Sequence, residues 1–177
     1  MEREIEVKVL HIDLEEMEAS LICSGAEKIG EEFQTNYLID SNRHPIGNAR
    51  GYLRLRHIET GEGERIECTF KEKKEDRGVR SHDEHTAHVD SVEGMLEIFA
   101  LLGYDQVVEA KKHRISYRYK NCRMDLDRWD PDSFPEPYME IEGPSAEAID
   151  TAIESLHIDR KKVSTKSIRE LKKSWNK

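Results

Sequence analysis

The chain has 177 residues, a length that fits a single domain with a substantial core. Its formal net charge of −9 argues against a general nucleic-acid or membrane-surface binder, so any basic site must be local. Three widely spaced cysteines, with no leader and no long apolar run, are typical of the reducing cytosol, so we expect a cytoplasmic protein without nucleic-acid or membrane partners.

The first stretch alternates strictly between charged and apolar residues. Residues 4–9 read Glu-Ile-Glu-Val-Lys-Val, the period-two pattern of a β-strand with one apolar and one charged face. The apolar face must pack on a core, while the other face carries two carboxylates and an ammonium group. For one isolated strand, the ordinary interpretation is a charged face exposed to water.

The first half of the chain predicts one helix followed by strands. Asp13, with Glu16 three residues later, predicts the start of the helix, and Gly25 predicts its end. Alternating segments bounded by turn residues predict the strands that follow, over 33–40, 51–56, 64–73 and 79–89.

The second half repeats this organisation, with no linker that would divide it from the first. Ser91 predicts the cap of a helix that ends at Gly103. Its apolar stripe, which we expect to pack on the core, consists of Met95, Ile98, Phe99 and Leu102. Further strands are predicted over 107–119, 122–129 and 138–142, and further helices after Ser145 and over about 165–175. We expect one domain over residues 1–177.

The charged faces of these strands carry charges of ordered sign. Carboxylate pairs are Glu4 and Glu6, Asp125 and Asp127, and Glu140 and Glu142. Cationic pairs are Arg54 and Arg56, Lys71 and Lys73, and Lys112 and Arg114. If these faces turned inward in an antiparallel sheet that closes or nearly closes, they would form a polar tunnel that is too costly to bury dry. The sequence therefore predicts an α+β fold of about eight strands around water, metal and an anion.

The two kinds of charge suggest the contents of the tunnel. Clustered glutamates suit Mg²⁺ or Mn²⁺, because hard cations prefer oxygen ligands. Arginine and lysine side chains suit a phosphate chain, and arginine can bind phosphate with two hydrogen bonds. A metal ion and cations that stabilise a transferring phosphoryl group are the usual means of phosphoryl-transfer catalysis.

Residues 4–8 also match the ExExK opening of the CYTH superfamily, the triphosphate tunnel metalloenzymes. Further segments resemble the family in the same order: 53–56, 69–71, 112–114, Asp127 and 140–142. The chain most resembles the class IV adenylyl cyclase-like branch, through residues 25–27, 102–104 and 139–143. The resemblance implies an antiparallel eight-stranded β-barrel, the triphosphate tunnel, with helices packed outside. Because members are often dimers, it also implies that a homodimer can form.

The resemblance assigns roles to individual residues. Metal ligands would be Glu4, Glu6, Asp127, Glu140 and Glu142. Triphosphate-binding residues would be Lys8, Arg54, Arg56, Lys71, Lys112, Arg114 and Lys166. Catalytic residues would be Glu4, Glu6, Lys8 and Glu84, with one of the three acids positioning or deprotonating the attacking water.

Three functions remain open from the sequence. The leading hypothesis is metal-dependent hydrolysis of an inorganic, nucleoside or other organic triphosphate such as tripolyphosphate or ATP. The alternatives are a class IV adenylyl cyclase and a non-catalytic polyphosphate or nucleotide sensor. Trp129 and Tyr138 could stack on a base, but a packing role is the better interpretation.

Overall fold

The computed structural model describes residues 2–46, 51–73 and 81–175, which form one antiparallel sheet of nine strands and four α-helices. The strands are β1 (Glu2–Val9), β2 (Glu27–Asp40), β3 (Gly51–Thr60), β4 (Gly63–Lys73), β5 (Ser81–Val89), β6 (Gln106–Tyr119), β7 (Cys122–Trp129), β8 (Tyr138–Gly143) and β9 (Val163–Ser164). The helices are α1 (Leu14–Cys23), α3 (Val92–Leu101), α4 (Ala146–Ser155) and α5 (Ile168–Trp175).

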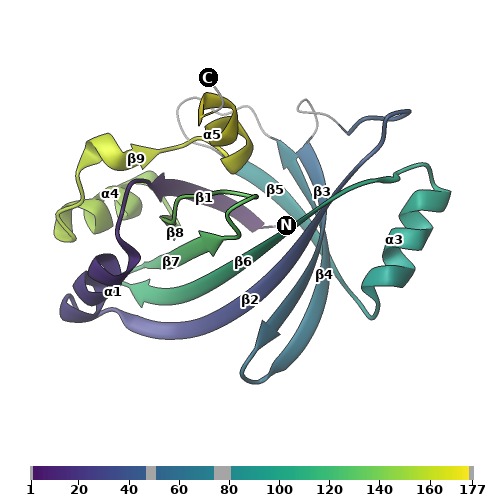
Figure 1. Cartoon of the computed structure of the whole chain (residues 1–177). Coiled ribbons are helices and arrows are strands. Elements are labelled where there is room, and N and C mark those ends of the chain that lie inside the picture. The colour runs from purple at the N-terminus through teal and green to yellow at the C-terminus, as the bar shows by residue number, and fades with distance from the viewer. Residues whose placement is uncertain (1, 47–50, 74–80, 176–177) are drawn as a thin grey trace.

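The sheet is strongly curved, and helices lie along its outside (Figure 1). Its strand order is β5-β4-β3-β2-β6-β7-β8-β1-β9, and β1 has an additional pairing with β5. In that pairing Glu2 lies opposite Glu84, and Ile5 lies opposite Ser81. Hydrogen bonds therefore join the two ends of the run of eight longer strands.

The predicted elements are found, with differences at their ends. The structure adds a ninth strand to the eight predicted segments: β9 has only two residues and is too short to show a period. β2 begins at Glu27 rather than at residue 33, because its first residues pair with β6 through a bulge between Lys28 and Gly30. Residues 79 and 80 of one predicted strand lie outside the described residues.

The main apolar core lies on the outer face of the sheet, beneath α1 and α4. Its fully buried members include Val9, Leu21, Met124, Met139 and Ile153. Burial on this face fixes the phase of each strand, because a shift by one residue would exchange the two faces. The outer face therefore holds the fold together, and the other face is left to polar side chains.

A second apolar cluster joins α3 to the outer face of β2 and β3. Met95 and Phe99 pack there against Ile39 and Leu55. The prediction that the whole stripe is buried was wrong, since Ile98 is 50% exposed and Leu102 is 64% exposed. The sequence of α3 is apolar on several sides, so its spacing did not define a single buried face.

The C-terminal helix α5 packs beside the loop that joins β7 and β8. Leu171 and Ile168 contact a cluster that contains Phe134, Tyr138 and Trp129. None of the described helices is both long and apolar enough to cross a membrane.

Candidate functional site

Polar and charged side chains fill the inner face of the sheet. Its buried members include Lys8, Gln34, Asn36, Arg54, Lys112, Arg114, Asp125 and Asp127. Buried charges are tolerated only when they are paired and hydrogen-bonded. The partners of these side chains therefore show what the interior is built to hold.

Lys8 joins two carboxylates from neighbouring strands. It lies opposite Glu140 in the β1–β8 register, and its Nζ lies 2.6 Å from Glu140 Oε1 and 3.0 Å from Glu6 Oε1. Burial alone would lower the pKa of Lys8, but the charges of Glu140 and Glu6 raise it above its usual value. Lys8 is therefore a fixed positive charge between two acids.

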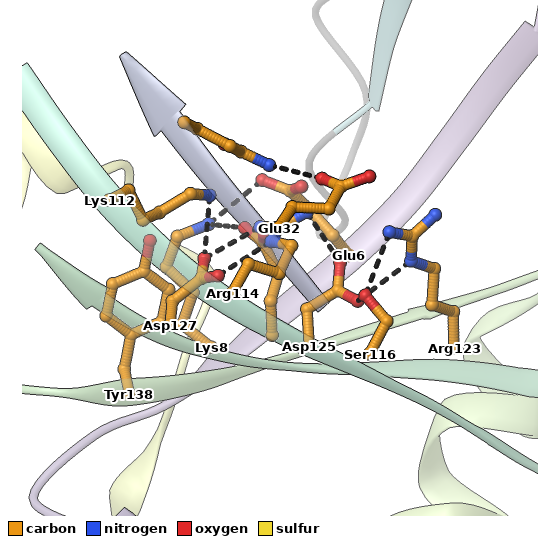
Figure 2. Close-up of polar contacts among 12 residues, drawn as sticks. Glu6, Lys8, Glu32, Lys112, Arg114, Ser116, Arg123, Asp125, Asp127 and Tyr138 are labelled. Atoms are coloured by element: carbon orange, nitrogen blue, oxygen red, sulfur yellow. Dashed lines mark hydrogen bonds and ion pairs between the residues drawn. The ribbon is translucent and has the colours of Figure 1, made fainter. Parts of the chain in front are cut away.

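Arg114 is the centre of a larger network of ion pairs (Figure 2). Its Nε and Nη2 donate to Asp127 at 2.6 and 2.7 Å, and Nη2 also donates to Glu140 at 2.7 Å. Its Nη1 lies 2.6 Å from Asp125 Oδ2. Burial opposes the charge of Asp127, but Arg114 and Lys112 still lower the pKa of this carboxyl.

Two glutamates face each other across the β1–β8 pair. Glu6 lies opposite Glu142, one pair away from Lys8 and Glu140. Like charges placed directly opposite are unfavourable, and Lys8 Nζ, 3.0 Å from Glu6 Oε1, offsets part of this repulsion. Carboxylate oxygens at this position fit a divalent cation, although no group of three or more acidic, histidine or cysteine side chains is arranged for metal binding among the described residues. The side chain of Glu4, the next residue on this face, lies outside the described part of the chain.

A third polar contact region lies on β4 and β5. Lys71 forms an ion pair with Glu84, its partner in the register. One pair further along, the hydroxyls of Thr69 and Thr86 lie 3.0 Å apart. The interior is therefore polar on this side as well.

The cations of β3 differ from Lys8 and Arg114, because no ion pair joins Arg54 or Arg56 to a carboxylate within the described ranges. Arg56 Nε instead donates to the neutral amide oxygen of Asn36 at 2.9 Å. Removal from water and the charges of Arg54 and Arg114 lower the pKa of Arg56 to about 9. An anion bound here would relieve this repulsion.

Lys112 lies between the ion pairs around Arg114 and the arginines of β3. Its Nζ is 3.0 Å from Asp127 Oδ2 and 5.1 Å from the centre of the Trp129 ring. Burial, the largest cause, and the charge of Arg114 lower the pKa of Lys112 to about 7, even though Asp127 acts in the opposite direction.

The structure brings most of the predicted residues together and leaves one apart. The inner face gathers Glu6, Lys8, Arg54, Arg56, Lys71, Glu84, Lys112, Arg114, Asp127, Glu140 and Glu142. Lys166, in contrast, is exposed to solvent before α5. Trp129 and Tyr138 belong to the cluster beneath α5, and Trp129 Nε1 donates to the Tyr138 hydroxyl at 2.9 Å.

Sequence reasoning missed the inner face of β2. Glu32, Gln34 and Asn36 point inward, and the last two are among the most buried polar residues. Their alternation with Phe33, Thr35 and Tyr37 was visible in the sequence, but neutral amides look like ordinary surface residues.

Comparisons with known proteins agree with this arrangement. The model of the CYTH domain matches residues 2–173. No curated protein matches the chain.

Several solved structures share the fold. The PH1012 protein of Pyrococcus horikoshii OT3 is 24% identical over 95% of this chain and 98% of that chain, with a TM-score of 0.77. HpAC1 of Hippeastrum, a candidate adenylyl cyclase described as having a dominant triphosphatase activity, is 16% identical over 88% of this chain and 85% of that chain, with a TM-score of 0.65. The mimivirus capping-enzyme triphosphatase is 10% identical over 88% of this chain and 89% of that chain, with a TM-score of 0.55. At these identities the likeness shows the fold alone.

Proposed function

The chain belongs to the CYTH family, and from this premise we propose that it is a divalent-metal-dependent enzyme that hydrolyses a triphosphate. The substrate would lie in a tunnel enclosed by the eight longer strands. The pairing of β1 with β5 supports such closure, because it joins the two ends of that run of strands. The polar inner face supports an interior that holds water and ions.

One observation carries the proposal. Among the described residues of the interior, Arg54 and Arg56 have no carboxylate partner, whereas Asp125, Asp127 and Glu140 each pair with Arg114. Arg54 and Arg56 face inward without an ion pair in the described part of the chain. Lys112 is almost fully buried, and its pKa is lowered to about 7. A phosphate chain supplies the negative charge that Arg54 and Arg56 lack, and arginine matches its oxygens with parallel hydrogen bonds.

Glu6 and Glu142, together with Glu4, would hold the metal ion in this proposal. They face each other across β1 and β8 or follow on the same face. Bound Mg²⁺ or Mn²⁺ would neutralise negative charge on the phosphates. Asp127 fits a different role, because both its oxygens accept hydrogen bonds from Arg114 and Lys112. We assign it to positioning these two cations.

The remaining steps rest on the chain's own side chains. Arg54, Arg56 and Lys112 would bind the phosphate oxygens and stabilise charge that develops on the leaving phosphate. A carboxylate, Glu6 or Glu84, would orient the attacking water and accept its proton. The oxygen of that water ends on the released orthophosphate as the phosphoanhydride bond breaks.

The second candidate is a class IV adenylyl cyclase, in which the ribose 3′-hydroxyl replaces water as the nucleophile. The description of HpAC1 names both activities in one protein of this fold. Both reactions would use the same cations and carboxylates. They differ in the nucleophile and in the phosphorus atom attacked.

Phosphorus NMR separates these functions. The protein is incubated with Mg²⁺ or Mn²⁺ and with either tripolyphosphate or ATP. Orthophosphate, with pyrophosphate or ADP as the second product, supports hydrolysis. Cyclic AMP with pyrophosphate would replace the proposal with a cyclase. Tight binding of both ligands without products would favour the sensor.

A further inference from the structure

The inner face of β2 carries two amides with unsatisfied atoms. Gln34 and Asn36 are each 2% exposed, and they lie two residues apart on one face of the strand. Among the described residues, Gln34 Oε1 and Asn36 Nδ2 have no hydrogen-bond partner. Buried polar atoms cost free energy until something bonds to them, so this pair points to a ligand.

Charged neighbours fix the orientation of both amides. Gln34 Nε2 donates to Glu32 Oε2 at 2.7 Å, and a reversed amide would set an oxygen against that carboxylate. Asn36 Oδ1 accepts from Arg56 Nε at 2.9 Å, and a reversed amide would set an NH₂ group against the guanidinium. The free atom of Gln34 is therefore an acceptor, and the free atom of Asn36 is a donor.

This combination does not match a phosphate. A deprotonated phosphate oxygen only accepts hydrogen bonds, so it could satisfy Asn36 Nδ2 but would leave Gln34 Oε1 without a donor. A neutral group that presents a donor and an acceptor side by side would satisfy both atoms. A nucleobase edge and an amide are groups of this kind.

The surroundings of the amides are apolar toward the end of β2. Leu38 lies opposite Val108, and Asn36 lies opposite the small side chain of Ala110, all in phase with the inward side chain of Lys112. Leu38 is 42% exposed and Val108 is 62% exposed, so they form an accessible apolar rim. On the other side of β2, Leu38 pairs with Arg54, which keeps the rim next to the cations.

We propose that these residues form a subsite for the non-phosphate part of an organic triphosphate. The subsite consists of Gln34, Asn36, Leu38, Val108 and Ala110. It takes a group with an adjacent donor and acceptor on an apolar frame, while Arg54 and Arg56 hold the phosphates beside it. This inference rests on the proposed function, and it names an organic triphosphate rather than inorganic tripolyphosphate as the substrate class.

The test compares nucleoside triphosphate with tripolyphosphate in binding and in turnover. Calorimetry gives the affinities for ATP, GTP and tripolyphosphate in the presence of Mg²⁺, and phosphate release gives kcat/KM. Gln34→Met keeps the length of the side chain but removes the free acceptor. Val108→Gln changes an exposed rim position where folding is not at risk. Thr35→Val, on the outer face of the same strand, is the matched control.

We expect Gln34→Met to weaken binding of the better nucleotide by about tenfold relative to tripolyphosphate, because a site built to hydrogen-bond a substrate strongly depends on that match. Val108→Gln should lower the ratio of nucleotide affinity to tripolyphosphate affinity severalfold, and Thr35→Val should leave this ratio unchanged.

Two failures can be told apart. If the variants change both ligands equally, or if the wild-type protein prefers tripolyphosphate over both nucleotides, the subsite is wrong while hydrolysis can stand. If neither ligand is turned over, hydrolysis is wrong, but the ratio of affinities still decides the subsite.

Discussion

Two sides of the polar interior solve the problem of buried charge in different ways. On the side of β1, β6, β7 and β8, Lys8 and Arg114 each meet carboxylates; we call this the paired side, made of Glu6, Lys8, Arg114, Asp127 and Glu140. On the side of β2 and β3, Arg56 meets the neutral amide of Asn36, and Arg54 Nε has no hydrogen-bond partner among the described residues; we call this the open side, made of Gln34, Asn36, Arg54 and Arg56.

The difference indicates that the two sides have different roles. Ion pairs on the paired side hold its side chains in place before any ligand binds, as a preorganised site requires. The open side keeps polar atoms and charges unsatisfied, so it loses stability that a bound ligand would restore. Changes on the paired side should therefore affect folding first, and changes on the open side should affect binding first.

The largest effect is expected from Arg114→Leu. This change leaves Asp125, Asp127 and Glu140 without their shared cation in a buried site. Breaking a buried ion pair by removing one partner costs about 3–5 kcal/mol of folding free energy. Urea unfolding followed by circular dichroism measures the loss.

Arg123→Leu is the matched control for this experiment. Arg123 also pairs with Asp125, but its side chain is 42% exposed, so its loss should cost about 0–1 kcal/mol. Equal losses in the two variants would mean that the buried ion pairs of Arg114 contribute no more to folding than the exposed ion pair of Arg123.

The next effect concerns the proposed metal. Glu6→Gln should lower turnover by about 100-fold at limiting Mn²⁺, because even residues that only hydrogen-bond to the ligands of a metal change its affinity by about 10- to 100-fold. Folding should be less affected than in Arg114→Leu, since Lys8 keeps its 2.6 Å contact with Glu140. A titration of activity with Mn²⁺ separates weaker metal binding from a direct loss of chemistry. Full turnover with an unchanged Mn²⁺ midpoint would remove Glu6 from the metal site.

The paired side was also the part that the sequence predicted best. Alternation placed Lys8, Arg114 and Asp127 on inward faces, because charges of ordered sign on successive strands favour an enclosed face over one exposed to water. The sequence could not say which charges meet, since this depends on the register between distant strands, such as Lys8 opposite Glu140. That register is set by packing of the outer apolar face against α1 and α4.

The open side was predicted only in part. Arg54 and Arg56 were expected to face a phosphate, but Gln34 and Asn36 carry no charge and gave no signal of their own. Lys166 is a different case, because it was assigned by resemblance alone and is exposed in the structure. Neutral residues reveal their role only when their buried atoms and neighbours are known.

A smaller effect is expected from Arg56→Met, and it should weaken ligand binding rather than folding. Removing a cation that has no carboxylate partner among the described residues should leave folding stability unchanged or slightly raise it, because its desolvation and its repulsion by Arg54 and Arg114 disappear. Affinity for tripolyphosphate should fall about tenfold or more, since hydrogen bonds to charged groups contribute about 1.5–3 kcal/mol. Urea unfolding and calorimetry on the same sample give both quantities. A folding loss as large as that of Arg114→Leu would erase the distinction between the two sides.

The smallest expected effect is the uptake of a proton by Lys112 when a phosphate chain binds. The pKa of Lys112 is lowered from 10.5 to about 7, so between these values the unfolded chain holds a proton that the folded protein lacks. The contribution of Lys112 to stability is therefore least favourable below pH 7 and rises as the pH increases toward 10.5. A bound phosphate chain favours the ammonium form, which raises this pKa and draws in up to about one proton near pH 8.

Calorimetry in buffers of different ionisation enthalpy measures this uptake. The binding enthalpy of tripolyphosphate at about pH 8 should depend on the buffer in the wild-type protein, and the dependence should weaken in Lys112→Met. Arg56, whose pKa is lowered to about 9, should add little at this pH because it is already charged. If the variant retains the full buffer dependence, the proton goes elsewhere, and Lys112 belongs with the permanently charged cations of the paired side.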